Sequence, residues 1–270
     1  MLRDRVVTAA ILVVAFLILV YFASALMWAS ACIVVTAAAA NEWGRLAGLV
    51  NRNAYYFAAV AALLSSAIVL IGTTHIYLMT VTLGGAFWIF VAPFWLYSRT
   101  AMRGRCRLLI AGVVVLTATC TALISLREIN PNALLAVMAI VWLSDTVAFF
   151  GGRRFGKRKL AAGISPGKSW EGVWCALAAV SGYACMWWVF HPDSLPDMVR
   201  LIPGLPWAAI LLWVLIAGFG IVGDLVESQL KRIAGAKDSG RCLPGHGGIL
   251  DRIDALTAAL PLAAFLYLIR

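Results

Sequence analysis

Long, nearly uninterrupted apolar runs are the feature that most restricts how this chain can fold. Of the 270 residues, 63% are hydrophobic and only 13% are charged. About 20 apolar residues in a helix cross a bilayer, whereas the core of a soluble protein of this length cannot hide so many runs of that size. The sequence therefore predicts an all-α, polytopic integral membrane protein.

Nine segments have the length and composition of transmembrane helices. The first two belong to one apolar stretch from Val6 to Ala40, which we interpret as two helices because 35 residues in one helix would overshoot the bilayer. One long tilted helix is the alternative. No soluble insertion interrupts the pattern, so a single membrane domain is predicted over 1–270. The nine predicted segments are 7–22, 24–40, 54–72, 76–97, 108–126, 132–150, 171–190, 207–227 and 249–269.

Lysine and arginine are distributed unequally between the two predicted sides of the membrane. The N-terminus and the four loops on its side hold 18 of the 22 residues, and loops rich in Lys and Arg stay in the cytoplasm. We therefore expect a cytoplasmic N-terminus and active site, in a bacterial inner membrane. The net charge of +10 lies mainly in these loops, so anionic membrane lipids are expected partners and nucleic acid is not.

Acidic residues from four predicted helices fall at one depth, near the cytoplasmic ends. Ionisable groups at a bilayer boundary are expensive to desolvate, and several at one level favour a function. Asp224 and Glu227 are three residues apart, as are Asp251 and Asp254. Each pair therefore lies on one helical face, and both pairs can point into a shared cavity. Such an oxygen cage suits Mg²⁺, and structural ion pairs with Lys231, Arg232 or Arg252 are the alternative. The acids are Asp145, Glu171, Asp224, Glu227, Asp251 and Asp254.

Two polar loops at the same level combine glycines, hydroxyls and cations. The stretch 243–248 surrounds His246 with glycines before a helix, where backbone amides bind anions, and an ordinary turn is the alternative. His246 would act as a proton donor, a hydrogen-bond donor to phosphate or a turn residue. The loop 151–171 suits phosphate binding through Ser165, Lys168 and Ser169, although its spacing is not that of a P-loop. A polybasic loop attracted to anionic lipid is the alternative.

Together these motifs resemble those of the phosphatidate cytidylyltransferases, also called CDP-diacylglycerol synthases. One signature begins at Ser228 and ends at Asp254, and a second similar region runs from Asp145 to Glu171. The resemblance covers about the C-terminal half, so 132–270 is the predicted catalytic half, while the first five helices match mainly in length and hydropathy. The charged and glycine positions of the first signature are Lys231, Arg232, Lys237, Asp238, His246, Gly247, Gly248, Asp251, Arg252 and Asp254.

The resemblance implies that CTP and phosphatidic acid are joined to give CDP-diacylglycerol and pyrophosphate, with Mg²⁺ as cofactor and a second cation left open. We expect Asp224 and Asp251 to hold the metal, with Asp254 and Glu227 behind them or on the additional cation. The expected catalytic residues are Asp224, Asp251, Lys237, His246 and Arg252. The expected substrate-binding residues are Asp145, Ser165, Lys168, Ser169, Glu171, Lys231, Arg232 and Asp238.

The sequence leaves three other functions open. Another CTP-dependent transferase would act on a different lipid phosphate. An ion-coupled transporter would use the intramembrane acids as a relay, although no internal repeat indicates the inverted halves of such proteins. A catalytically silent membrane scaffold would not be stabilised by CTP with Mg²⁺. Whether the protein forms a homodimer is also left open.

Overall fold

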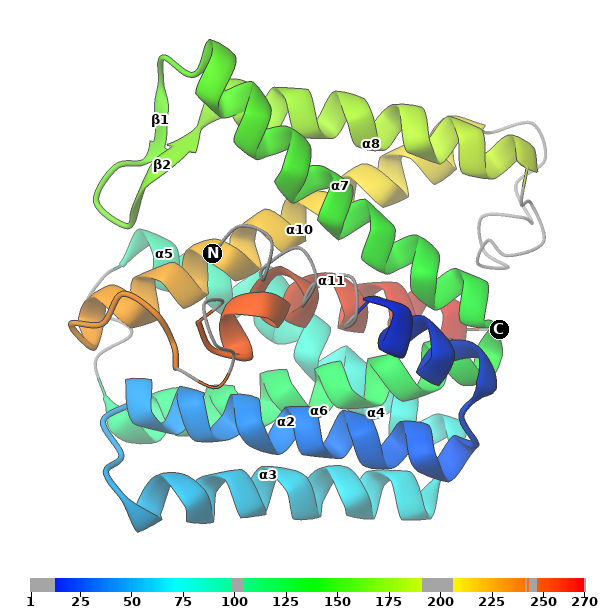
Figure 1. Cartoon of the computed structure of the whole chain (residues 1–270), viewed down its shortest axis with the longest axis vertical. Helices are drawn as coiled ribbons and strands as arrows, with labels where there is room; N and C mark the ends of the chain where they lie inside the picture. The colour runs from blue at the N-terminus through cyan, green and yellow to red at the C-terminus, as the bar shows by residue number, and fades with distance from the viewer. Residues whose placement is uncertain (1–12, 99–103, 191–205, 241, 243–246, 270) are drawn as a thin grey trace.

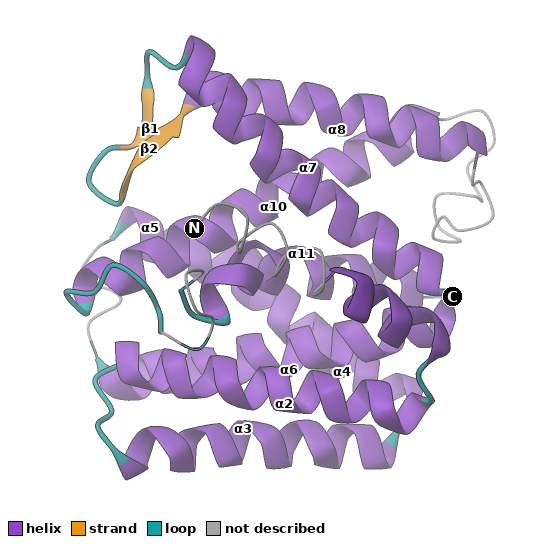
Figure 2. Cartoon of the chain, in the orientation of Figure 1, coloured by secondary structure: helices purple, strands orange, loops and turns teal. Residues whose placement is uncertain are grey.

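The computed structural model describes residues 13–98, 104–190, 206–240, 242 and 247–269. Most of them are helical, and one two-stranded hairpin is present (Figures 1 and 2). The predicted all-α membrane class is therefore confirmed. The elements are a first helix Val13–Phe22, α2 Ala25–Leu46, α3 Arg52–Ile71, α4 Thr74–Ala86, η1 Phe87–Val91, α5 Ala92–Tyr97, α6 Arg105–Ile129, α7 Pro131–Phe155, β1 Lys159–Ala161, β2 Ser165–Ser169, α8 Trp170–Phe190, α10 Pro206–Ile233 and α11 Leu250–Leu268.

Seven of the described helices are long and apolar enough to cross a membrane, so the predicted count of nine is not confirmed. The π-helical turn η1 joins α4 to α5, and these three elements together make one of the seven. The first helix is shorter than a span over its described residues. The last helix, α11, has 19 residues and begins with Asp251, Arg252 and Asp254, whose charges lower its hydropathy.

The first apolar stretch forms two helices, as predicted, and the alternative of one long helix is wrong. The first helix ends at Phe22, and the Ser24 hydroxyl caps α2 by accepting from the Met27 amide at 3.2 Å. Arg127 of α6 holds the break in place. Its Nε donates to the Val20 carbonyl at 2.8 Å, and a second guanidinium nitrogen donates to the Ala23 carbonyl. Carbonyls at the end of the first helix thus gain a partner inside the protein.

The helices form layers, with α2 and α3 on one side, α7 and α8 on the other, and α10 and α11 between them (Figure 1). Helix α11 contacts α4, α6, α7 and α10 and is the centre of the bundle. Its buried residues include five alanines, which let neighbouring helices approach closely. The approach is tight at Gly223 of α10, where a Cβ would lie 2.7 Å from the Asp254 carbonyl oxygen. This contact brings Asp224 next to the first turns of α11.

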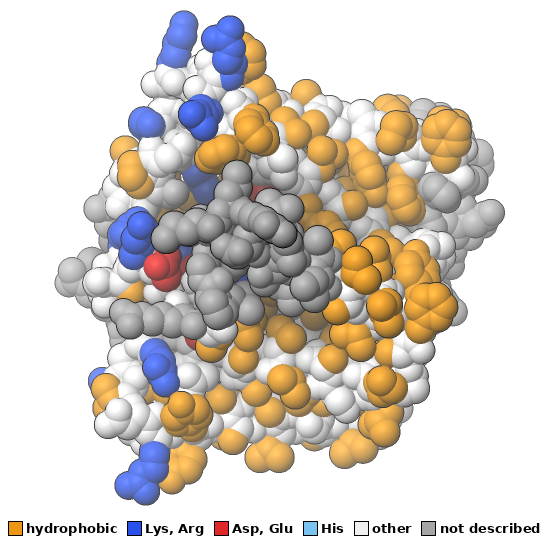
Figure 3. All heavy atoms as spheres, in the orientation of Figure 1, with side chains coloured by type: hydrophobic (Ala, Val, Ile, Leu, Met, Phe, Trp, Pro, Cys, Tyr) orange, Lys and Arg blue, Asp and Glu red, His pale blue; other side chains and the backbone are white. Residues whose placement is uncertain are grey.

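The β1–β2 hairpin follows α7 and leads into α8. Its strands are antiparallel, with Lys159 opposite Ser169 and Ala161 opposite Ser165. In the space-filling view, Lys and Arg side chains gather along the edge of the molecule where the hairpin lies, and most of the apolar side chains seen on this face lie away from that edge (Figures 1 and 3). The charged end of the bundle and its apolar body are therefore separated, as expected for a membrane protein.

Candidate active site

A polar cavity of about 390 Å³ lies between the hairpin and the ends of α7, α10 and α11. Residues of α7, β1, β2, α8, α10 and α11 form its wall. Asp224 and Asp251, the two residues expected to hold a metal, both line it. The structure therefore brings together seven of the predicted site residues, whose roles stay predictions. They are Asp145, Ser165, Lys168, Ser169, Asp224, Asp251 and Asp254.

Lys168 spans the cavity from the hairpin to α10. Its Nζ lies 2.5 Å from Asp224 Oδ2, and the two side chains are 25% and 26% exposed. Asp224 Oδ1 also accepts from the Ser228 hydroxyl at 3.2 Å, one turn further along α10. Because this ion pair is partly open to solvent, it contributes little stability, and either partner can exchange it for another charged group.

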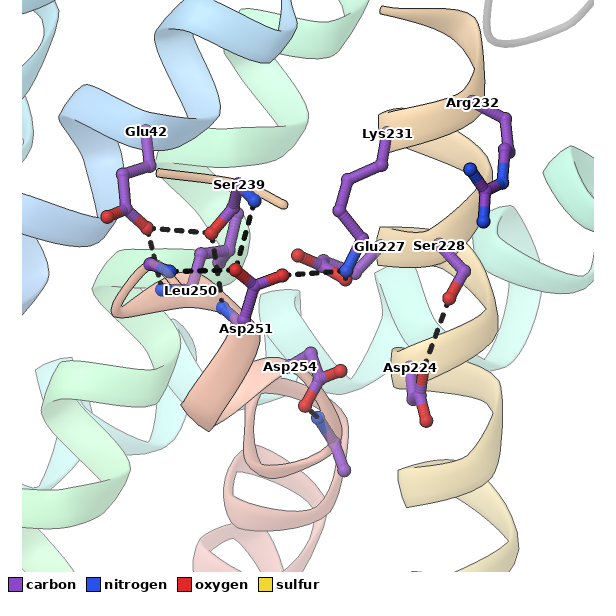
Figure 4. A network of polar contacts seen from close by, with 12 residues as sticks. Glu42, Asp224, Glu227, Ser228, Lys231, Arg232, Ser239, Leu250, Asp251 and Asp254 are labelled. Atoms are coloured by element: carbon purple, nitrogen blue, oxygen red, sulfur yellow. Dashed lines mark hydrogen bonds and ion pairs between the residues drawn. The ribbon is translucent and has the colours of Figure 1, made fainter. Parts of the chain in front are cut away.

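A second lysine bridges two acids deeper in the protein (Figure 4). Lys231 Nζ lies 2.5 Å from Glu227 Oε2 and 2.7 Å from Asp251 Oδ1. The other oxygen of Asp251 accepts from the backbone amides of Ser239 at 3.0 Å and Gly248 at 2.8 Å. Lys231 thus ties the end of α10 to the start of α11 through two ion pairs, and its predicted substrate-binding role stays a prediction.

Two further acids of the cluster, Glu227 and Asp254, lie close to one another's charge. Glu227 Oε1 is buried and has no hydrogen-bond partner. Asp254 is half-buried and accepts from the amide of Ala255 at 2.8 Å, while the charges of Asp224, Glu227 and Asp145 act on it. Acids clustered in this way favour binding of a further positive charge. Among the described residues, however, no three His, Cys, Asp or Glu side chains are grouped as metal ligands. The expected oxygen cage is therefore not preformed in this part of the chain.

Several predicted site residues have other contacts. Glu171 accepts from the Lys157 amide at 3.0 Å and pairs with Arg158 Nε at 3.2 Å, so it closes the base of the hairpin, and its predicted substrate-binding role stays a prediction. Arg232 Nε donates to the Ile164 carbonyl at 3.3 Å. Ser169 lines the cavity, but its hydroxyl accepts from the Gly172 amide at 3.2 Å.

Two further predicted residues do not line the cavity, and a third lies outside the described residues. Lys237 and Asp238 are exposed in the turn that follows α10 and do not line the cavity. His246 lies outside the described residues, so its predicted role stays a prediction.

Glu42 of α2 is a residue that the sequence reading missed. Its side chain is 2% exposed and accepts from the Ser239 hydroxyl at 2.9 Å, the Ile249 amide at 3.0 Å and the Leu250 amide at 2.8 Å (Figure 4). Glu42 thereby caps α11 from another helix. The predicted segment 24–40 ended before Glu42, whereas α2 continues to Leu46. A single carboxylate directly after an apolar segment was the signal in the sequence that could have indicated this residue.

Comparisons with known proteins agree with the motifs at this site. The sequence model of a family described as the cytidylyltransferase family matches residues 3–270. The phosphatidate cytidylyltransferase of Pseudomonas aeruginosa is 35% identical over 278 aligned residues, which cover 98% of this chain and 97% of that protein. The phosphatidate cytidylyltransferase of Haemophilus influenzae is 47% identical over 134 residues, 50% of this chain and 45% of that protein. The one from Staphylococcus epidermidis is 44% identical over 129 residues, 48% of this chain and 46% of that protein.

Proposed function

The chain belongs to the cytidylyltransferase family, and we propose that it transfers the cytidylyl group of CTP to phosphatidic acid, giving CDP-diacylglycerol and pyrophosphate. The family resemblance read from the motifs is thus confirmed. A relative named phosphatidate cytidylyltransferase that matches almost the whole chain supports the lipid substrate. The observation that carries the proposal is the polar cavity, where Lys168 and four aspartates meet at the charged end of a membrane bundle.

The reaction needs charge neutralisation more than proton transfer. The second pKa of a phosphate monoester is about 6, so phosphatidic acid is mostly dianionic at neutral pH and needs no strong general base. A phosphate oxygen of the lipid forms a bond to the α-phosphorus of CTP, and the bond from that phosphorus to pyrophosphate breaks. A cation in the cavity would neutralise part of the charge on the reacting phosphates, and among the described residues Lys168 is the one Lys or Arg that lines it.

Lys168 is the cation best placed for this task. It lies on β2 and reaches across the cavity to Asp224, so an incoming phosphate would compete with a carboxylate for its ammonium group. Ser165, on the same strand, also lines the cavity and offers a hydroxyl donor to a phosphate oxygen. The hairpin would therefore hold the nucleotide, while α10 and α11 supply the acids opposite it.

The acids at this site suit a magnesium ion that binds together with the nucleotide. Mg²⁺ usually takes one or two carboxylates and fills its remaining positions with water and substrate phosphate. Asp224 and Asp251 would hold it, with Glu227 and Asp254 behind them or on a second cation. The buried, unpartnered Glu227 Oε1 supports the need for added positive charge. When bound, the metal would stabilise charge on the transferred phosphate and on pyrophosphate.

We place the cavity at the cytoplasmic face of a bacterial cell membrane. The hairpin that forms one wall lies at the edge where Lys and Arg gather (Figures 1 and 3), and loops rich in these residues stay in the cytoplasm. CTP is available on that side only, so the orientation agrees with the proposed substrate. The relatives reported above are bacterial proteins. Homodimer formation stays a prediction that light scattering of the purified protein would test.

The decisive experiment measures pyrophosphate release by the purified protein in detergent micelles that contain phosphatidic acid, CTP and Mg²⁺. We expect release that requires all three components and yields CDP-diacylglycerol. The same assay with labelled CTP and a total lipid extract identifies a different lipid phosphate, if one is the substrate. No labelled lipid in either assay, together with ion flux across liposomes without CTP, would refute the transferase and support the transporter. A melting temperature unchanged by CTP with Mg²⁺ would support the scaffold.

A further inference from the structure

A second cavity, of about 250 Å³, lies on another side of α11 and is almost entirely apolar. The first helix, α2, α6, α7 and α11 form its wall. Bulky side chains at its rim include Trp28 of α2 and Trp142 of α7. Arg252 is the one charged residue among the described residues that line it. An apolar cavity with a single cation matches a ligand that has an apolar body and an anionic end.

Helix α11 separates this apolar cavity from the polar one. Asp251 and Asp254 face the polar cavity, whereas Arg252, Leu256 and Leu260 line the apolar cavity. The last three residues span eight positions of the helix, or about 12 Å at 1.5 Å per residue. The apolar cavity therefore runs along α11 away from its charged first turn and towards the middle of the bundle.

We propose that the apolar cavity holds an acyl chain of the phosphatidic acid, with Arg252 beside the phosphate of that lipid. This inference rests on the proposed function, because it names where the lipid substrate lies. Arginine pairs well with phosphate through its planar fork of donors. Apolar side chains of five helices surround the acyl chain. Since Arg252 adjoins Asp251, the lipid phosphate lies at the boundary between the two cavities. Its oxygen is then next to the nucleotide held in the polar cavity.

The charge at the end of the cavity distinguishes the substrate from a bulk bilayer lipid. A structural lipid needs only the apolar wall, and most bilayer lipids cover their phosphate with a choline, ethanolamine or glycerol group. Phosphatidic acid carries a bare phosphate monoester, whose two negative charges attract the Arg252 guanidinium more strongly than the single charge of a phosphodiester does. With an acyl chain among its apolar side chains and a phosphate beside Arg252, the apolar cavity selects the substrate by acyl-chain length and by headgroup together.

A pair of neighbouring substitutions tests the inference. Val35 of α2 lines the cavity, whereas Val34 is 68% exposed on the outside of the same helix. We expect Val35→Phe to raise the KM for dioleoyl phosphatidic acid about tenfold, the effect of excluding roughly two methylene groups. The KM for dihexanoyl phosphatidic acid and for CTP should stay within about twofold of the parent. Val34→Phe, the matched control, should change none of these constants.

A measurement on the unmodified protein covers the case in which Val35→Phe does not fold. Phosphatidic acid with a photoreactive diazirine in one acyl chain should label peptides of α2 and α11, and dioleoyl phosphatidic acid should compete. Equal labelling by a diazirine phosphatidylcholine would show a bulk lipid in the cavity and overturn the inference. So would a Val35→Phe enzyme with the chain-length preference of the parent. If the parent releases no pyrophosphate with any phosphatidic acid, the proposed function fails instead.

Discussion

Replacing Glu42 by Gln should destabilise the protein and slow catalysis, although Glu42 lies in neither cavity lining described above. The substitution keeps the size of the side chain but removes its charge and one acceptor oxygen. Three donors converge on the carboxylate, namely the Ser239 hydroxyl and the amides of Ile249 and Leu250. In the variant at least one of them faces an amide group that cannot accept its hydrogen bond.

The size of the effect follows from these contacts. A buried hydrogen bond to a charged group is worth about 1.5–3 kcal/mol, and the two remaining bonds fall to about 1 kcal/mol each when the acceptor is neutral. The expected loss is about 3–5 kcal/mol, comparable to breaking a buried ion pair. For a chain of this size, that corresponds to a fall in melting temperature of about 6 °C or more. The start of α11 loosens as well, and Asp251 follows Leu250 directly, so kcat should fall.

Melting temperature and pyrophosphate release, measured on the same preparation, check this prediction. Activity is assayed well below the melting temperature of the variant, so that loss of kcat is separate from unfolding. Glu128→Gln is the matched control, since Glu128 is an exposed carboxylate of α6 and the chemical change is identical. If Glu42→Gln melts with the control and keeps the parent kcat, Glu42 does not hold α11 and the reasoning fails.

Three further substitutions separate catalysis from packing. Asp224→Asn breaks a partly exposed ion pair, so the free energy of unfolding should change by about 1 kcal/mol or less. Magnesium-dependent pyrophosphate release should fall at least about 100-fold. Normal turnover would remove the metal assignment. Lys231→Met leaves two buried carboxylates without their shared cation, and thermal unfolding should show a loss of about 3–5 kcal/mol. Gly223→Ala forces a Cβ against a backbone oxygen of α11 and should cost about 1–3 kcal/mol. Gly218→Ala, on the same helix but with open space around it, should melt like the parent; equal effects would argue against close packing of α10 on α11.

Hydropathy and spacing predicted most of the helices, because the period and length of an apolar run depend on nearby residues only. They also placed the acids of α7, α10 and α11 at one level, and Asp145, Asp224, Asp251 and Asp254 do line one cavity. The family followed from a resemblance of the signature residues, whose order and spacing are read directly from the sequence. These are the parts of the fold and site that one sequence can give.

Partners far apart in the sequence could not be predicted. Glu42 and Ser239 are 197 positions apart, and nothing in either segment indicates that they meet. The hydropathy pattern also ends a helix where polar residues begin, although α2 continues past Glu42 because its carboxylate is satisfied by another part of the chain. From the sequence, Arg252 is assigned to the same site as Asp251 and Asp254, because the direction of a helical side chain depends on how the helix packs. Successive residues of a helix point about 100° apart, and only the packing of α11 shows that Arg252 lines the apolar cavity.

Helix α11 connects the N-terminal half of the chain to a site whose motifs lie in the C-terminal half. Helix α2 contributes Glu42 to the cap of α11 and Val35 to the apolar cavity. A shift of α2 would therefore change the apolar cavity directly and would move Asp251 through the start of α11. A substrate with one charged end and one apolar end must be held on both sides of this helix at once. We therefore expect variation in α2 to change lipid selectivity, while the hairpin and α10 determine how the nucleotide is held.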